Sequence, residues 1–109
     1  MEDKPWGDFC EIFGVTPRNR ILEFFLSLDG LDFTISDIAE EVRLNRATTY
    51  NTMKELINDE YIILSRKVSA GQLYKLNKNK LEVKKLLKVM DQIIDKIYDD
   101  YTKKEKVYA

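Results

Sequence analysis

The sequence contains no histidine and only one cysteine, Cys10. Zinc and other soft metals are bound mainly by cysteine and histidine, so a metal site has almost no ligands to be built from. The same shortage removes the most common general base and any serine–histidine or cysteine–histidine pair. A single cysteine also excludes an internal disulfide and fits a reducing compartment such as the cytoplasm. We therefore predict no metal, no cofactor and no enzyme activity.

Long hydrophobic runs are missing as well. No apolar run approaches the roughly 18 residues that a membrane-spanning helix needs, and the N-terminus MEDKPW has no signal-peptide features. The 109 residues are 44% hydrophobic and 34% charged, a composition typical of folded proteins. These properties predict one domain with one modest core, no membrane span and a cytoplasmic location.

Positive charge is concentrated in the middle of the chain, although the whole chain carries a net charge of only −1. Residues 1–42 hold 3 basic and 10 acidic side chains, whereas residues 43–80 hold 8 basic and 3 acidic ones. Residues 81–109 are nearly balanced, with 7 basic and 6 acidic side chains. A basic region within a nearly neutral protein favours a negatively charged partner for residues 43–80.

The first third of the chain predicts two helices. Apolar residues at helical spacing in PWGDFCEIFG indicate a short amphipathic helix that ends at Gly14. Thr16 and Pro17 are suited to the N-cap and first position of a second helix. Its predicted buried stripe consists of Ile21, Leu22, Phe25 and Leu28. Asp29-Gly30 would close this helix, and LDF would follow as a short extended piece.

The next segment predicts two short helices joined by a tight turn. Thr34 with Asp37 three positions later resembles a capping box and would open a helix over ISDIAEEV. The turn Arg43-Leu44-Asn45 would follow, and Asn45 can cap a helix from Arg46 to about Asp59. The pair predicts a helix-turn-helix.

A β-hairpin is expected directly afterwards. YIILSRKV and QLYKLN contain β-branched and alternating apolar residues, and Ser69-Ala70-Gly71 separates them. A helix-turn-helix followed by a hairpin is a winged helix. The predicted fold is thus mainly α with a small β-hairpin, a winged helix-turn-helix followed by a long C-terminal helix.

The C-terminal helix is predicted from about Lys80 to Lys104. Its main apolar stripe steps by three and four residues and consists of Val83, Leu87, Met90, Ile94, Ile97 and Tyr101. This stripe is longer than so small a domain needs, so we expect it to pack on a second copy of the chain. The alternative is that it folds back on Trp6, Phe9 and the first helices of the same chain. Tyr98 would join the packing.

At this point the sequence resembles a known group. The runs EIFGVTPRNRILEFFLS, FTISDIAEEVRLNRATTYNTMKELINDEYI and SRKVSAGQLYKLN are similar to the small archaeal winged-helix transcription regulators, relatives of the MarR and ArsR classes. The resemblance implies a dimer that binds double-stranded DNA, with one helix in the major groove and the hairpin wing near the backbone. We predict three parts along the chain: an N-terminal packing helix (1–15), a winged helix-turn-helix DNA-binding domain (16–78) and a C-terminal dimerisation helix (79–109).

Two positions depart from the pattern of that group. Glu60 stands where glycine is usual before the Tyr61-Ile62 pair, so the exit from the recognition helix is expected to differ. Thr49 replaces an inward-facing valine, which is expected to loosen the core there. Metal sensing of the ArsR type does not carry over, because its ligands are missing.

Helical geometry separates the recognition helix into two faces. With Thr49, Met53, Leu56 and Ile57 inward, the opposite side is basic and rich in hydrogen-bonding groups. Arginine can bond guanine bidentately, asparagine can do the same for adenine, and a longer basic side chain can reach phosphate. The predicted DNA-binding residues are Asn45, Arg46, Ala47, Thr48, Tyr50, Asn51 and Lys54. The alternative is an ordinary solvated helix face.

Further contacts are predicted outside that helix. Ser36, near the start of the preceding helix, would clamp a phosphate. The wing would contribute Arg66, Lys67, Gln72 and Lys75. Alternatively, the wing lysines only protect an edge strand from aggregation. Cys10 would be an inert apolar residue, with a redox sensor as the alternative.

These observations lead to a hypothesis with one alternative. The hypothesis is a sequence-specific, homodimeric transcriptional regulator, most simply a repressor that occupies a promoter. The alternative is a winged-helix protein-interaction module in a larger transcription or plasmid-maintenance assembly, bound through the acidic N-terminal third. The sequence does not say whether a small molecule regulates the protein.

Overall fold

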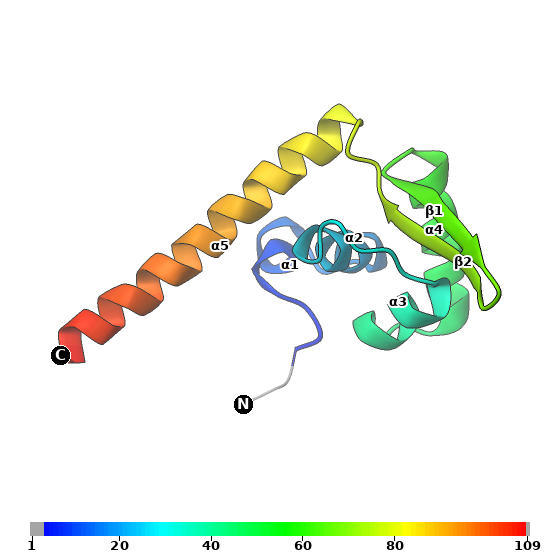
Figure 1. The fold of residues 1–109 in the computed structure, drawn as a ribbon. Helices are drawn as coiled ribbons and strands as arrows, with labels where there is room; N and C mark the ends of the chain where they lie inside the picture. The colour runs from blue at the N-terminus through cyan, green and yellow to red at the C-terminus, as the bar shows by residue number, and fades with distance from the viewer. Residues whose placement is uncertain (1–3, 109) are drawn as a thin grey trace.

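A computed structural model describes residues 4–108 of the chain, with side chains up to residue 103. Five helices and a two-stranded antiparallel sheet follow one another within these residues (Figure 1). Their bounds are α1 Asp8–Phe13, α2 Pro17–Ser27, α3 Ile35–Val42, α4 Arg46–Asn58, β1 Ile62–Val68, β2 Gly71–Leu76 and α5 Leu81–Tyr108. The predicted fold class is confirmed.

The helix starts follow from local capping, as predicted. Thr16 accepts a hydrogen bond from the Asn19 backbone N–H and has Pro17 after it. Thr34 and Asp37 form a complete capping box at the start of α3. α2 ends at Ser27, which leaves Leu28 outside the helix and 39% exposed, so its predicted place in the buried stripe is wrong.

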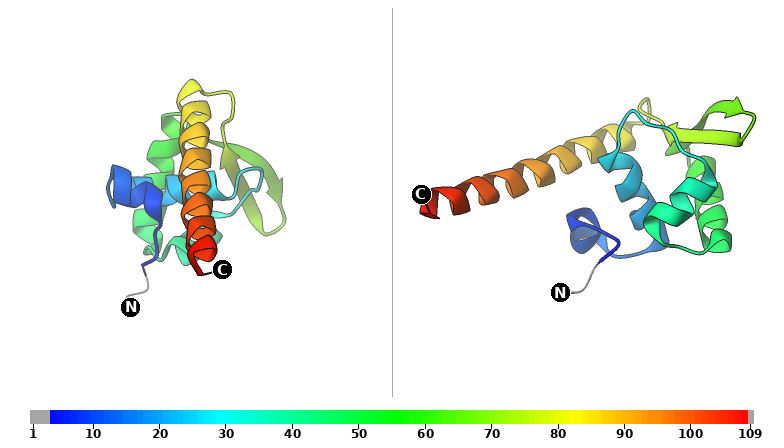
Figure 2. Two further views of the ribbon diagram at one scale, coloured as in Figure 1. Left: turned by 90° about the vertical axis from the view of Figure 1, so that its left-hand side faces the viewer. Right: turned by 60° about the horizontal axis from the view of Figure 1, so that its bottom comes forward.

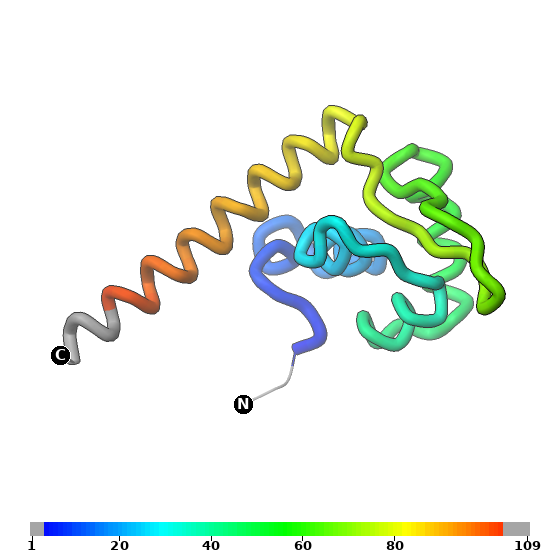
Figure 3. The backbone as a smooth tube through the Cα atoms, in the orientation of Figure 1, coloured from blue at the N-terminus to red at the C-terminus, as the bar shows by residue number. Residues whose placement is uncertain are grey.

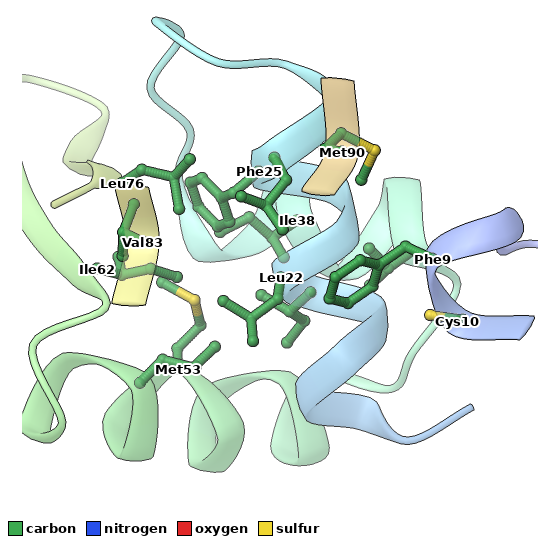
Figure 4. Packing of buried hydrophobic residues seen from close by; sticks show 14 residues of the cluster. Phe9, Cys10, Leu22, Phe25, Ile38, Met53, Ile62, Leu76, Val83 and Met90 are labelled. Atoms are coloured by element: carbon green, nitrogen blue, oxygen red, sulfur yellow. The ribbon is translucent and has the colours of Figure 1, made fainter. Parts of the chain in front are cut away.

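The core lies where α2, α3, α4, the hairpin and the start of α5 meet. Figure 4 shows Met53 from α4, Ile62 from β1 and Val83 from α5 pointing into the same interior as Phe25 of α2. These four side chains are at most 1% exposed. α4 is thereby packed on the apolar core through its inner face.

The hairpin is tighter than the sequence suggested. Val68 pairs with Gly71, so the connection consists of Ser69 and Ala70 alone, and Gly71 opens β2 with a φ of +135°. A bulge at Ser65 shifts the register between Leu64 and Arg66. Phe33 exchanges two backbone hydrogen bonds with Tyr74, which confirms the short extended piece before α3.

α5 projects beyond the body of the molecule. Figures 2 and 3 show that its first turns lie against the other helices while its later turns extend away from them. The principal extents are 52 × 32 × 27 Å. The radius of gyration is 15.5 Å, against roughly 13 Å for a compact chain of this length. No helix within residues 4–108 is long and apolar enough to cross a membrane.

Glu60 adopts the backbone conformation that glycine favours. Its φ is +66°, and its carbonyl accepts a hydrogen bond from the Asn77 side chain at 2.9 Å. A non-glycine residue in this region is strained. The exit from α4 therefore keeps the turn that a glycine would make, with Glu60 at this position. The sequence had predicted a different exit from the helix.

Replacing Glu60 with glycine should stabilise the fold. We expect Glu60→Gly to raise the free energy of unfolding by about 1 kcal/mol, because glycine adopts positive φ without steric cost. Urea denaturation followed by circular dichroism measures this change. The matched control is Asn58→Gly, within the exposed last turn of α4, which should lower stability by about 0.3 kcal/mol, because asparagine is only slightly better than glycine in a helix. Equal losses in both variants would contradict the strain at Glu60.

Candidate nucleic-acid interface

The turn before α4 fixes where the recognition helix begins. Arg43 has a φ of +56° in the left-handed region and ends α3. The Asn45 side-chain oxygen accepts a hydrogen bond from the Thr48 backbone N–H at 2.7 Å. The oxygen of Asn45 is thus engaged as the helix cap, and its amide nitrogen can donate to DNA. The Arg20 guanidinium donates to the Val42 carbonyl and thereby ties α2 to the end of α3.

The inward face of α4 contains two threonines. Thr49 is fully buried, and its hydroxyl donates to the Asn45 carbonyl at 2.9 Å, so the polar group is satisfied within the helix. Thr52 is also buried, which we did not predict. Its burial could have been predicted from its position, three residues after Thr49 and one before Met53, which places it on the inner face of α4. Ile57 is only partly buried.

The outward face of α4 is exposed as the helical geometry predicted. Arg46, Ala47, Asn51 and Lys54 are all exposed, and Tyr50 is 52% exposed. Thr48, by contrast, is half-buried. The Lys54 ammonium lies 5.5 Å from the centre of the Tyr50 ring. This contact gathers a positive charge and an aromatic edge at one place on the face, next to the exposed Asn51.

Arg46 connects the two helices of the helix-turn-helix. Its guanidinium donates to the hydroxyl of Ser36 in the first turn of α3. The predicted phosphate clamp and the first residue of the recognition helix therefore lie side by side. Because guanidinium has five N–H donors, Arg46 keeps donors for a base or a phosphate while Ser36 orients it.

The wing arginine is held by a carboxylate. Arg66 Nε donates to Asp32 at 2.9 Å, and the Ser65 hydroxyl donates to the same carboxylate at 2.8 Å. Hydrogen bonding to Arg66, followed by that to Ser65, lowers the pKa of Asp32, and the same carboxylate raises the pKa of Arg66. Arg66 is thus positioned, and its charge is partly offset.

The other wing residues separate into two places. Lys67 pairs with Gln72 next to the hairpin tip, and the Gln72 side-chain oxygen accepts the Tyr74 hydroxyl at 2.7 Å. Lys75 pairs with Ile63 near the base of the hairpin. Four residues along a strand span roughly 13 Å, so Lys75 lies well away from the tip. The structure does not bring all four predicted wing residues together.

The stripe along α5 divides into a buried and an exposed part. Val83 is 0% and Met90 5% exposed within the chain's own core, and Leu87 packs partly against it. The expectation that Val83 and Met90 contact a partner is therefore corrected, because the first turns of α5 fold back on α1 and α2. Ile94, Ile97 and Tyr101 remain 50%, 51% and 62% exposed.

The exposed part of α5 lies near apolar residues of α1. Ile97 of α5 and Ile12 of α1 line one hollow of about 350 Å³ between the two helices. Ile12 is 63% and Phe13 51% exposed. We call Ile12, Phe13, Ile94, Ile97, Tyr98 and Tyr101 the apolar end of the molecule.

Cys10 lies in a setting that suppresses thiol reactivity. It is fully buried, and its backbone N–H donates to the Glu23 carboxylate at 2.9 Å. Burial, followed by the charge of Glu23, raises the pKa of its thiol to about 12. The described residues contain no group of three or more cysteine, aspartate or glutamate side chains that could hold a metal ion.

Cys10 should therefore be inert in the folded protein. We expect negligible reaction with Ellman's reagent at pH 8, because the reactive thiolate is disfavoured until the pH nears 12. The exposed Ser27→Cys variant is the control and should react at once at its new thiol. The raised pKa of Cys10 also contributes to the pH dependence of folding. Its contribution to the free energy of unfolding is complete below about pH 9 and is lost as the pH rises toward 12. Prompt reaction of native Cys10 would revive the redox alternative.

No protein-family model and no curated protein matches the chain. Solved structures do match. A MarR family transcriptional regulator from Silicibacter pomeroyi is 22% identical with a TM-score of 0.55, over 78% of this chain and 55% of its own. The adhesin competence repressor AdcR from Streptococcus pyogenes is 15% identical with a TM-score of 0.59, over 78% of this chain and 61% of its own.

A third neighbour was solved with DNA. It is a MepR variant from Staphylococcus aureus bound to an oligodeoxyribonucleotide, 15% identical with a TM-score of 0.58, over 85% of this chain and 67% of its own. The fold is a winged helix. At these identities the likeness is one of fold, and the chain spans less than two thirds of the Silicibacter and Streptococcus proteins.

Proposed function

We propose that the chain is a sequence-specific regulator of transcription that binds double-stranded DNA as a homodimer. The observation that carries this proposal is the outward face of α4. Arg46, Asn51 and Lys54 are exposed there together, with no carboxylate before Glu55 in the helix. The winged-helix neighbours include one bound to an oligodeoxyribonucleotide, which supports the same use of this fold.

Each exposed residue of α4 has a role in this proposal. Arg46 bonds the O6 and N7 atoms of a guanine, and Asn51 bonds the N6 and N7 atoms of an adenine. Ala47 and the edge of Tyr50 contact a thymine methyl, and Lys54 reaches a phosphate. Ser36 orients Arg46 and clamps a neighbouring phosphate. Lys67 and Gln72, at the wing tip, contact the DNA backbone beside the groove.

The apolar end of the molecule supports a homodimer. Of the thirteen large apolar side chains that are exposed in the described part of the chain, six belong to α1 and the later turns of α5, the two helices that line one hollow. Pairing with a second copy would remove them from water and would bring two α4 helices to one duplex. The dimer would read a pseudo-palindrome with half-sites about 10 bp apart. Occupation of a promoter makes repression the simplest outcome, and AdcR is itself described as a repressor.

The protein-interaction alternative is weakened by the partners of the acidic N-terminal third. Within residues 4–42, five carboxylates accept hydrogen bonds or form ion pairs inside the chain: Glu11, Glu23, Asp29, Asp32 and Asp37. An acidic docking surface would need these groups free. The proposal also includes a location in the cytoplasm and a relationship to the small archaeal winged-helix regulators.

In vitro selection tests this function. Purified protein is incubated with random duplexes of about 30 bp, and bound sequences are enriched over several rounds. We expect a two-fold symmetric motif with two half-sites about one helical turn apart. A parallel selection with Asn51→Ala should lose the preference for adenine at one position of each half-site. Enrichment of no motif would contradict sequence-specific binding.

A further inference from the structure

The Tyr61 ring joins three elements at the exit of the recognition helix. The Arg18 guanidinium from α2 lies over the ring at 5.1 Å from its centre. The Lys80 ammonium, directly before α5, lies over the same ring, also at 5.1 Å. Arg18 additionally forms a 3.1 Å ion pair with Asp59, the C-cap residue of α4. Two cations from separate elements thus converge on one aromatic side chain.

The backbone around this ring is also tied together. The Tyr61 N–H donates to the Leu56 carbonyl within α4, and the Asn77 N–H donates to the Tyr61 carbonyl. The Lys80 N–H then donates to the Asn77 carbonyl and leads into α5. A continuous series of hydrogen bonds of 2.9–3.2 Å therefore runs from the end of α4 to the start of α5.

The direction of α5 determines where a second copy would lie. About 17 residues separate Lys80 from Ile97, which corresponds to roughly 25 Å of helix. Val83 and Met90 hold the first turns of α5 in the chain's own core, so contacts at Lys80 act together with that packing on the direction of the helix. A change of about 10° in that direction would move Ile97 by roughly 4 Å relative to Lys80, close to the 3.4 Å rise of one base pair. Because both copies of a two-fold dimer change together, a small change of the angle between α4 and α5 would change the spacing between the two α4 helices by about one to two base pairs.

We propose that Tyr61 is a positioning residue: Arg18 and Lys80 on its ring, together with the packing of Val83 and Met90 in the core, hold the angle between α4 and α5, and this angle sets the half-site spacing that the dimer accepts. The inference rests on the proposed function, because it assumes a DNA-binding dimer formed through α5. It assigns Tyr61 no contact with DNA and none with the second copy.

The first test is a spacing series. Duplexes carry the selected half-sites with the spacer altered by one and two base pairs in either direction. Wild-type protein should prefer one spacing, and Tyr61→Leu should reduce this preference about tenfold while leaving affinity for an isolated half-site unchanged. Tyr61→Phe keeps the ring and should restore the preference. Lys80→Met should act like Tyr61→Leu, whereas Lys84→Met, one turn further along α5, should act like wild type.

The second test does not depend on DNA. Spin labels at Asn58→Cys in α4 and Asp95→Cys in α5 report the distance between the helices, with Cys10 buried and unlabelled. Labelled protein is diluted with excess unlabelled chain so that only distances within one chain are measured. We expect a narrow distribution with Tyr61 or Tyr61→Phe and a broad one with Tyr61→Leu or Lys80→Met.

The two measurements separate the inference from the proposed function. If wild-type protein binds no DNA but the distance distribution broadens in Tyr61→Leu, the role of Tyr61 in holding the angle between α4 and α5 is supported and the proposed regulatory function is contradicted. If DNA binds specifically while both the spacing preference and the distance distribution stay unchanged in Tyr61→Leu and Lys80→Met, the role proposed for Tyr61 is contradicted.

Discussion

Reversing the charge of Arg46 and Lys54 together is expected to reduce DNA affinity at least 100-fold. Both side chains are exposed on the outward face of α4. A bidentate arginine–guanine contact contributes about 1–3 kcal/mol of discrimination, and each added carboxylate would also repel phosphate. The double variant Arg46→Glu with Lys54→Glu, measured by fluorescence anisotropy at constant salt, gives the loss directly.

A matched pair of lysines provides the control for this loss. Lys84 and Lys88 are exposed on α5, outside the helix-turn-helix and the wing. Lys84→Glu with Lys88→Glu changes the net charge by the same amount and should lower affinity only slightly. Equal losses in both double variants would indicate attraction by overall charge alone. A silent Arg46/Lys54 reversal would favour the protein-interaction alternative.

Placing carboxylates on the exposed part of α5 is expected to convert the dimer to a monomer. Ile94 and Ile97 are about half exposed, so Ile94→Asp with Ile97→Asp should leave the fold of each chain intact. Four such isoleucines would meet in a two-fold dimer, and each would lose about 1 kcal/mol of burial. The dimer dissociation constant should therefore rise roughly 1000-fold or more.

Sedimentation velocity measures this conversion. Wild-type protein should sediment as a dimer at micromolar concentration and the double variant as a monomer. Gln92→Asp lies on the exposed opposite side of the same helix and should remain dimeric. DNA affinity should fall together with dimerisation, because a monomer contacts one half-site only. A monomeric wild type, or a variant that remains dimeric, would contradict the role given to the apolar end.

Features with local causes were predictable from the sequence. Thr16, Thr34 and Asn45 cap their helices as expected, because an N-cap depends only on residues within one turn. The exposed positions of α4 followed from helical periodicity alone. The roles of these residues in DNA binding remain predictions.

Features with distant causes were not predictable. The hydrogen bonds from Arg66 to Asp32 join residues 34 positions apart, and nothing in either neighbourhood indicates the other. Periodicity in α5 identifies an apolar face but not what covers it, so Val83 and Met90 were assigned to a partner although the chain's own core buries them. Leu28 was misplaced because α2 ends one residue before it.

Binding of the purified protein to the DNA upstream of its own coding sequence tests the central claim most directly. Fluorescence anisotropy is measured for this duplex and for an unrelated duplex of equal length between 50 and 300 mM salt. The account predicts tighter binding to the upstream duplex at every salt concentration and an affinity that falls steeply as salt rises. Equal, weak binding to both duplexes, or none, would contradict it.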